Sequence, residues 1–406
     1  ASAGMEPTSI SYPFRKIFHH RKNFYFRMAE VRAIFPERNI IQTSIGKIEY
    51  DYLILAAGTT TNFYGNRHIE EEAIPMKNVS EAMGLRNALL AIFVRALTCA
   101  TYQEQQELLN VVVVGGVATG VEVAGVLSEM KKFVLPNDYP DMSSNLMHVY
   151  LIEAGPRLLA GMSEKSSAHA EQFLREMGVN ILLNKKVVDY RNHKVVLEDG
   201  SAIATRTFIW VSGITGVPIR NMDSSLIWRG GLIKVNEYNQ VIGLNNVFAI
   251  GDQCIQLTDK KYPNGHPQLA QVAIQQGELL AKNLVRYEKG MKMKPFHYRN
   301  LGSMATVGRN RAVAEFNKVK MQGWFAWIMW LVVHLRSILG VRNKVIVLLN
   351  WIWNYLTFDQ SMRMIVYARK AKEIRDREII EATTHLGDDL MQEQQQKEQQ
   401  KVERSE

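Results

Sequence analysis

A glycine-containing turn between an apolar strand and a helix is the stretch whose residue types most directly indicate chemistry. Residues 111–114 are all valine, which predicts a buried strand, and the turn after them contains Gly115, Gly116 and Gly120. Residues 121–130 then have the pattern of a helix. Free amides at the start of such a helix, together with its dipole, favour a phosphate group. The stretch therefore predicts a site for the pyrophosphate of a dinucleotide.

The match to the dinucleotide fingerprint G-x-G-x-x-G is incomplete, because Val117 occupies the position of the middle glycine. A valine Cβ there would stand where the backbone normally approaches the pyrophosphate. An ordinary strand–turn–helix is therefore the alternative interpretation. Glu153, at the end of the next predicted strand, supports a nucleotide site, because its carboxylate can accept a hydrogen bond from a ribose 2′-hydroxyl. A carboxylate also disfavours a 2′-phosphate, which favours NADH over NADPH, and a solvated acid at a strand end is the competing interpretation.

Three further apolar segments end in glycine, as a strand does where it leads into a turn. Their glycines are Gly58, Gly213 and Gly251. Asp252 follows the last of them and can accept a hydrogen bond from a ligand hydroxyl. A plain core strand is the alternative for the segment before Gly58.

A predicted helix at 266–284 carries amide side chains on an otherwise apolar surface. They are Gln271, Gln275 and Gln276. Side chains at positions i and i+4 share one face of a helix, so Gln271 and Gln275 can belong to one site. A solvent-facing polar strip is the alternative.

The remaining patterns predict the framework. Ser80 is a plausible N-cap for one helix, and Gly178 stands where a glycine would end another. The elements of the predicted framework are a loop at 1–15, a strand at 23–35, a hairpin around 44–47, helices at 78–107 and 168–177, and a hairpin at 187–203.

The composition indicates a globular protein of two or three domains. The chain has 406 residues, 47% of them hydrophobic, and a formal net charge of +9. Such a charge suits nucleic acid, an anionic membrane surface or an anionic ligand. The two cysteines, Cys99 and Cys254, are too few for a disulfide framework, so we expect a reducing compartment.

The C-terminal third differs from the rest in its aromatic and charged residues. Five of the seven tryptophans lie between Trp324 and Trp353, and residues 316–358 contain no Asp or Glu. The apolar segments at 324–333 and 345–356 are too short to span a bilayer. Tryptophan, aliphatic and basic residues together favour helices that lie in the bilayer interface, and a buried helical pair or a dimer interface is the alternative.

In this order, the motifs resemble those of the type II NADH dehydrogenases, which are single-chain NADH:quinone oxidoreductases. The resemblance runs from about Ala1 to Lys372. The matching segments are YDYLILAAG, VVVVGGVATGVEVAG, VYLIEAGPRLL, FIWVSGITG, NVFAIGD, AQVAIQQG, GSMATVGRNRAV and WIWNYLTFD.

The resemblance implies an α/β fold with two Rossmann-like dinucleotide-binding domains, in which the NADH domain is inserted into the FAD domain. A C-terminal membrane-anchoring region with amphipathic helices follows. The implied division is 1–107 for the first part of the FAD domain, 108–232 for the NADH domain, 233–296 for the second part of the FAD domain, 297–375 for the anchoring region and 376–406 for a polar tail.

The resemblance also implies roles for individual residues. The NADH pyrophosphate would lie on Gly115, Gly116, Ala118, Thr119 and Gly120, and its adenosine ribose on Glu153, with Glu122 and Gly213 near the nicotinamide. FAD would lie against Gly58, Gly251 and Asp252, while Ala270, Gln275 and Gln276 would form the flavin–quinone junction.

The implied reaction passes a hydride from NADH to FAD and two electrons to a membrane quinone, without ion pumping. Gln275 and Gln276 would orient a quinone carbonyl as neutral groups, and Glu122 would tune the flavin–nicotinamide region or relay a proton. We expect a peripheral protein on the cytoplasmic face of a bacterial inner membrane. Its partners would be the quinone and the bilayer surface, not nucleic acid, and a homodimer stays open.

Two departures from the family keep other functions open. No glycine fingerprint for FAD precedes Ala1, so we expect the chain to lack about 30–50 residues there. Together with Val117, this motivates a catalytically impaired membrane-bound homologue as an alternative. An NADH oxidase or thiol peroxidase is another, with Cys254 as its candidate thiol. A disulfide reductase is excluded, because Cys99 and Cys254 lack the close spacing of a redox pair.

Overall fold

The computed structural model describes residues 7–317 and 319–357, and its largest sheet carries the predicted nucleotide turn. This sheet has five parallel strands in the order β6-β13-β7-β8-β9. All five residues of β7 are buried, as the valine run predicts. The strands are β6 (Ile74–Pro75), β7 (Asn110–Val114), β8 (His148–Ile152), β9 (Val179–Leu182) and β13 (Thr207–Trp210).

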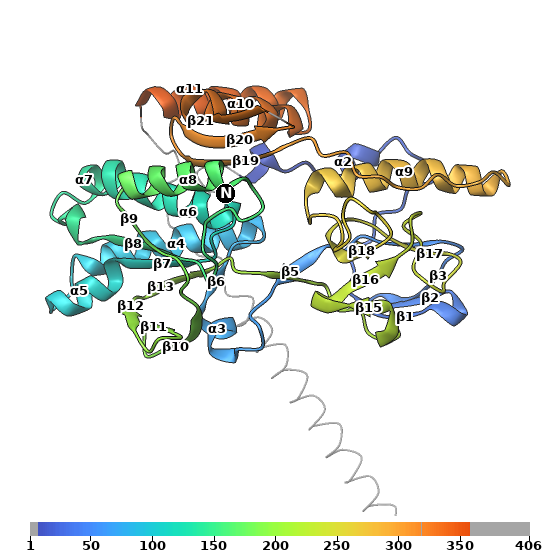
Figure 1. Ribbon diagram of the computed structural model, residues 1–406, viewed down its shortest axis with the longest axis horizontal. Helices are drawn as coiled ribbons and strands as arrows, with labels where there is room; N and C mark the ends of the chain where they lie inside the picture. The colour runs from blue at the N-terminus through green and yellow to red at the C-terminus, as the bar shows by residue number, and fades with distance from the viewer. Residues whose placement is uncertain (1–6, 318, 358–406) are drawn as a thin grey trace, which may run out of the picture. The chain divides into compact units, whose positions relative to one another are not determined.

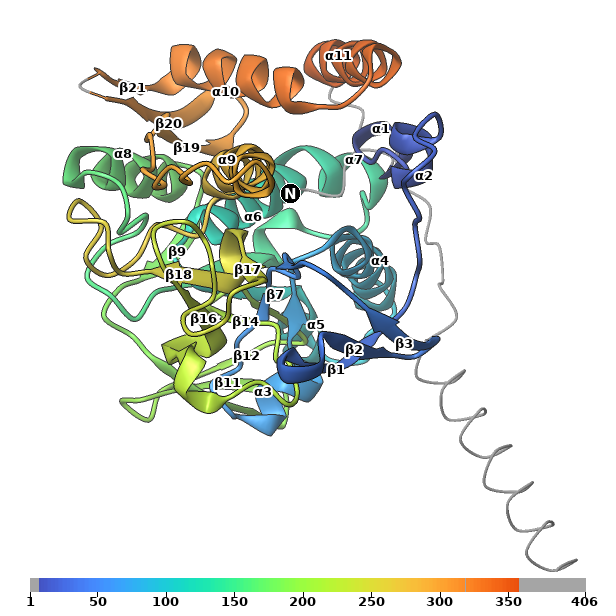
Figure 2. The same cartoon turned by 90° about the vertical axis from the view of Figure 1, so that its right-hand side faces the viewer.

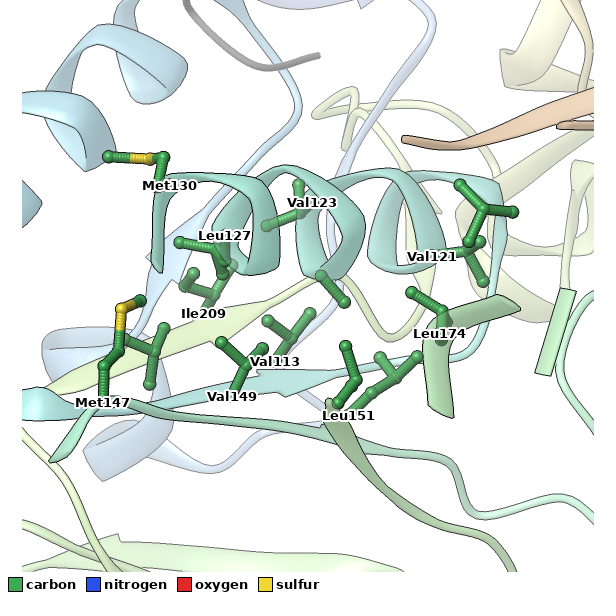
Figure 3. Close-up of a cluster of buried hydrophobic side chains, with 14 of the residues drawn as sticks. Val113, Val121, Val123, Leu127, Met130, Met147, Val149, Leu151, Leu174 and Ile209 are labelled. Carbon is green, nitrogen blue, oxygen red and sulfur yellow. The ribbon is translucent and has the colours of Figure 1, made fainter. Parts of the chain in front are cut away.

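Helix α6 (Ala118–Glu129) follows the turn and packs on this sheet. In Figure 3, side chains of α6 such as Val121 and Leu127 point toward Val113 and Val149 of the strands. These residues belong to the largest buried cluster of the described chain, which also includes residues of the helices before β7. Burying such branched side chains stabilises the fold by about 1.5–3 kcal/mol each.

The helical pattern at 78–107 is two helices and not one. They are α4 (Val79–Ala96) and α5 (Tyr102–Leu109). The N-cap of α4 is Asn78, not the predicted Ser80, because Asn78 and Glu81 form a capping box through hydrogen bonds of 2.9 and 3.2 Å. Since β6 and α4 belong with the five-stranded sheet, that sheet includes residues before 108, the predicted start of the NADH domain.

The segments before and after the five-stranded sheet in the sequence form several small sheets. The predicted hairpin around 44–47 is confirmed as β2–β3, but the predicted strand at 23–35 is regular only in β1. Strands β4 and β17 pair in parallel although about half of the chain separates them. The strands are β1 (Val31–Phe35), β2 (Ile40–Thr43), β3 (Gly46–Glu49), β4 (Leu53–Leu55), β15 (Ile227–Trp228), β16 (Leu232–Val235), β17 (Val247–Ala249) and β18 (Cys254–Gln256).

Two short antiparallel strands connect these regions. They are β5 (Thr59–Thr61) and β14 (Ile214–Gly216), which pair with each other (Figure 1). The helix predicted at 168–177 is α8, and Gly178 follows it with a φ of +81°. The other elements are α1 (Pro7–Ile10), α2 (Phe14–Phe18), α3 (Arg67–Glu72), α7 (Leu135–Asp138), α8 (Glu164–Glu176), α9 (Ala270–Glu288), β10 (Val187–Arg191), β11 (Lys194–Leu197) and β12 (Ala202–Ala204).

The C-terminal part is an antiparallel sheet with two helices. The strands are β19 (Ser303–Gly308), β20 (Arg311–Phe316) and β21 (Val319–Gln322), and the helices are α10 (Gly323–Ser337) and α11 (Val341–Thr357). Helix α10 packs on β20 through Ala326, Ala312 and Ala314 (Figure 1). Helix α6 approaches β19 so closely that a Cβ at Gly125 would lie 2.1 Å from the carbonyl oxygen of Val307.

Both apolar segments of the C-terminal third are helical. Within the described part of the chain, none of the helices has the length and apolar composition that crossing a membrane requires. The predicted polar tail at 376–406 lies outside the described residues.

Candidate dinucleotide and flavin sites

The turn between β7 and α6 requires glycine for reasons of space. Gly115 has a φ of +116° and donates a hydrogen bond of 2.8 Å to the carbonyl oxygen of Ile152. A Cβ at Gly120 would lie 1.9 Å from the carbonyl oxygen of Gly115. A Cβ at Gly115 would lie 2.9 Å from the backbone nitrogen of Ser212. The first turn of α6 can therefore meet the strand ends only where side chains are absent.

The N-terminus of α6 is open for an anion. Its N-cap is Val117, which provides no side-chain hydrogen bond, and its first turn contains no acidic residue. Val117 and Ala118 are exposed, whereas Gly116 and Gly120 are buried. The amides of this turn and the helix dipole thus favour a phosphate group on the exposed side of the turn.

Glu153 lies against the glycine turn, at the end of β8. Its Oε2 accepts a hydrogen bond of 2.6 Å from the amide of Gly116, and its Oε1 accepts one of 2.6 Å from the amide of Gly155. Each carboxylate oxygen keeps acceptor capacity beyond these bonds. The structure therefore brings together the predicted pyrophosphate turn and the predicted ribose acceptor.

Replacing Val117 by glycine tests whether this turn holds the pyrophosphate. Val117 is 49% exposed, so its side chain stands on the surface of the turn and not in the core. We expect Val117→Gly to lower the KM for NADH by about threefold to tenfold, because backbone amides can then approach the pyrophosphate. Steady-state NADH oxidation measures the change. An unchanged KM would place the pyrophosphate elsewhere.

The second set of predicted residues meets at the ends of β4 and β17. The amide of Ile250 donates to the carbonyl oxygen of Leu55 over 3.0 Å, which aligns the two strand ends. Gly58 and Gly251 follow them with φ values of +69° and +71°. Ligands of parallel sheets bind beyond the carboxyl ends of the strands, so this is the place for a second cofactor.

Two residues that the sequence did not indicate complete this strand end. Gln253 is fully buried, and its Oε1 accepts a hydrogen bond of 2.9 Å from the amide of Ala57. The ammonium of Lys77 lies 3.8 Å from the Asp252 carboxylate. Gln253 could have been found from the sequence, because it directly follows the Gly-Asp pair. Lys77 could not, because its contact with Asp252 joins segments 175 positions apart that no sequence pattern connects.

Helix α9 positions its two neighbouring glutamines differently. Gln276 is buried, and its Oε1 accepts a hydrogen bond of 2.7 Å from the amide of Gly251. Gln275 donates to the carbonyl oxygen of Arg299 over 2.9 Å and accepts from the amide of Arg299 over 3.0 Å. Gln271 donates to the carbonyl oxygen of Gly302 and accepts from the amide of Leu301, each over 3.0 Å. Ala270 is exposed in the first turn of α9.

The β5–β14 ladder links the two sets of residues. At one end the amide of Val217 donates to the carbonyl oxygen of Gly58 over 3.3 Å. At the other end the amide of Asn62 donates to the carbonyl oxygen of Gly213 over 3.2 Å. Gly213 directly follows Ser212, which touches the nucleotide turn. One short ladder therefore fixes the flavin-side glycine relative to the nucleotide-side glycine.

Glu122 is a residue of α6, and its side chain contacts the C-terminal part. Its Oε1 accepts a 3.4 Å hydrogen bond from the amide of Thr306, and its carboxylate also accepts one from the Trp330 side chain. Burial raises the pKa of Glu122, and these two bonds oppose the rise. The described contacts of Glu122 are thus to β19 and α10, while its predicted place near the nicotinamide stays a prediction.

The cysteines are not arranged for thiol chemistry. Cys254 is buried, and burial raises its pKa to about 12, which keeps the thiol protonated. Burial also raises the pKa of the Cys99 thiol. Both cysteines are free. A thiol peroxidase needs a thiolate, so the geometry disfavours that alternative.

Comparison with known proteins gives matches over most of the chain. A family profile described as pyridine nucleotide-disulphide oxidoreductase matches residues 3–277, and one described as the NDH2 C-terminal domain matches residues 300–358. The chain is 33% identical over 354 residues to the type II NADH:quinone oxidoreductase NdhA of Mycobacterium tuberculosis, which covers 83% of this chain and 74% of the relative. The Ndh protein of the same organism, also described as a type II NADH:quinone oxidoreductase, is 30% identical over 363 residues, covering 86% and 77%.

Solved structures share the fold. NDH2 of Plasmodium falciparum, solved in complex with NADH, aligns with a TM-score of 0.81 at 21% identity over 90% of both chains. The sulfide:quinone oxidoreductase of Aquifex aeolicus aligns with a TM-score of 0.66 at 18% identity over 89% of this chain and 84% of that one.

The five-stranded parallel sheet and its glycine turn define an α/β dinucleotide-binding protein. The chain belongs to the pyridine nucleotide-disulphide oxidoreductase family and, within it, to the type II NADH dehydrogenases. The predicted family is thereby confirmed.

Proposed function

We propose that this protein oxidises NADH through FAD and reduces a membrane quinone, without pumping ions. The observation that carries the proposal is the β5–β14 ladder, which ties Gly213, beside the nucleotide turn, to the strand-end turn at Gly58. The type II NADH dehydrogenase relatives and the NDH2 C-terminal domain support the same activity. Bound FAD accepts a hydride from NADH and delivers two electrons to the quinone.

On the NADH side, the chain would supply binding and orientation. The amides of Ala118 and Thr119 would hold the pyrophosphate together with the glycines of the turn, and the Glu153 carboxylate would accept from the adenosine ribose. Because Glu153 already bonds the Gly116 amide, one side chain would position both parts of the nucleotide. The open α6 terminus and the glycine cradle fit a dinucleotide.

On the flavin side, the residues present fit the part of FAD nearest the reacting ring. Gly58 and Gly251 would let the cofactor approach the backbone, and Asp252 would accept from a hydroxyl of the ribityl chain. The amide end of α9, at Ala270, carries no acidic residue and would stabilise negative charge on the ring. Lys77 would balance the charge of Asp252.

Gln275 and Gln276 would act at the flavin–quinone junction by fixing its backbone. Replacing both by leucine leaves the amides of Gly251 and Arg299 without their side-chain acceptors, at about 1–3 kcal/mol each. We expect the double variant to slow quinone-dependent flavin oxidation by about tenfold or more, with flavin reduction by NADH nearly unchanged. Double-mixing stopped-flow absorbance separates the two half-reactions.

A matched control replaces Gln103 and Gln172 by leucine. Both are exposed on other helices, so both half-reactions should keep their wild-type rates. A normal quinone half-reaction in the Gln275/Gln276 variant would remove these residues from the quinone site.

The exposed faces of α10 and α11 support docking to a bilayer. Exposed apolar side chains follow helical spacing along α11, beginning at Val341 and ending at Leu356. We propose that these helices lie in the interface and hold the quinone opening against lipid, which makes the protein peripheral. The proposal includes a location on the cytoplasmic face of a bacterial inner membrane and assembly as a homodimer. The alternative of a buried helical pair is disfavoured by this exposure.

A further inference from the structure

Residues 12–28, here called the N-terminal segment, form an exposed basic and aromatic surface that the proposed function does not use. The segment contains no Asp or Glu. Phe14 is 61% exposed, Tyr25 75% and Met28 86%. Its basic residues, all exposed, are Arg15, Lys16, Arg21, Lys22 and Arg27.

Ring stacking holds the segment in a defined shape. The rings of Phe18 and Phe24 lie 4.1 Å apart, and those of Phe14 and Phe26 lie 5.9 Å apart. The guanidinium of Arg15 lies 4.9 Å from the centre of the Phe26 ring. These contacts connect α2 to residues 24–26, so aromatic and cationic groups project together from one compact unit.

This unit lies next to the helices that we propose to meet the bilayer. Helix α1 contacts α11, and Figure 2 shows α2 next to α1, on the side away from α11. The ring of Tyr12 packs at the turn between α10 and α11, where a Cβ at Gly340 would lie 3.0 Å from its Cε2 atom. The exposed surface of the N-terminal segment is therefore continuous with that of α11.

The charges of the two neighbouring surfaces have the same sign. The C-terminal stretch 316–358 also lacks acidic residues and carries exposed Arg336 and Arg342. Interfacial aromatic rings together with cations suit phospholipid headgroups, because the rings enter the headgroup layer while the cations meet anionic lipid.

We propose that the N-terminal segment is a second lipid-binding element, which selects anionic phospholipid headgroups. The inference rests on the proposed docking of α10 and α11, since those helices bring the segment to the bilayer. The helices supply the apolar part of membrane affinity, and the segment supplies the dependence on lipid charge.

The test removes four charges from the segment and measures binding of the full chain to vesicles. The variant is Arg15→Gln, Lys16→Gln, Arg21→Gln and Lys22→Gln combined. Each basic residue near an anionic surface contributes about fivefold in affinity, so we expect at least about tenfold weaker co-sedimentation with phosphatidylglycerol-containing vesicles. Binding to pure phosphatidylcholine vesicles should not change.

The matched control removes the same number of exposed charges from other sheets and turns, at Arg38, Lys47, Lys194 and Arg229. It should keep its affinity for phosphatidylglycerol vesicles. Equal weakening of control and variant, or unchanged binding of the variant, would overturn the proposal. Binding to phosphatidylcholine vesicles tests the docking of α10 and α11 separately. If the variant binds these vesicles normally and its affinity for phosphatidylglycerol vesicles is also unchanged, the proposal for the segment fails while the proposed docking of the helices stands. Melting curves and NADH oxidation with a soluble quinone should be unchanged in both proteins.

Discussion

Gly120→Ala will lower kcat/KM for NADH by at least about a hundredfold, equivalent to about 2.7 kcal/mol. A Cβ at this position would lie 1.9 Å from the carbonyl oxygen of Gly115. The backbone fixes the positions of both atoms, so no rotamer change can relieve the contact. The first turn of α6 must therefore shift away from β7, which displaces the amides proposed to hold the pyrophosphate. Stopped-flow measurement of flavin reduction by NADH gives the effect directly.

Gly84→Ala is the matched control. Gly84 lies within α4, and a Cβ there would meet no atom within 4 Å. The control should keep its NADH kinetics and gain about 0.5–1 kcal/mol in the free energy of unfolding, because alanine is the better helix former. Gly120→Ala protein that retains its flavin and reduces it at the wild-type rate would contradict the proposed NADH site.

Combined replacement of Val345, Leu349, Ile352 and Leu356 by serine will release the protein from membranes. All four side chains are exposed on α11, with exposed fractions of 49%, 59%, 48% and 71%. Each large apolar side chain contributes about 1.5–3 kcal/mol when fully buried, so even partial insertion predicts a loss of more than about a thousandfold in vesicle affinity. Because none of the four is in the core, the fold should persist.

Vesicle co-sedimentation measures this loss, and four exposed apolar residues elsewhere provide the control. Replacing Ile45, Ile48, Val188 and Ile242 by serine removes a similar apolar area from other elements. This control should bind vesicles like the wild type. If the α11 variant binds as tightly as the control, another surface meets the bilayer.

The nucleotide turn could be predicted because its determinants are local. Four valines specify a strand buried on both faces, and the following glycines are needed within six positions of one another. Glu153 could also be placed, because the end of the neighbouring parallel strand must lie beside the turn. Their joint arrangement is confirmed by hydrogen bonding, whereas their contact with NADH stays a prediction.

The flavin side could be predicted only in part, because its determinants are far apart in sequence. Gly58 and Gly251 were recognisable as strand exits, but their meeting depends on the parallel pairing of β4 with β17. Lys77 became visible only through its distance to Asp252. No periodicity in the sequence encodes such pairings, since they are set by how the sheets assemble.

The glutamines show the limit of helical periodicity. The pattern placed Gln271 and Gln275 on one face, and both do bond to the same backbone segment, at 299–302. Gln276, one position further, points about 100° away and is buried against Gly251. The N-cap of α4 is a similar case, because Asn78 and Ser80 are both good caps and only the reciprocal bond with Glu81 decides between them.

The most direct test of the central activity is an anaerobic titration of the purified flavoprotein, followed by the absorbance of the flavin at about 450 nm. We predict that NADH bleaches this band stoichiometrically and that a quinone added afterwards restores it. A flavin that NADH does not bleach, or one that stays reduced in the presence of quinone, would contradict the proposed transfer from NADH to quinone.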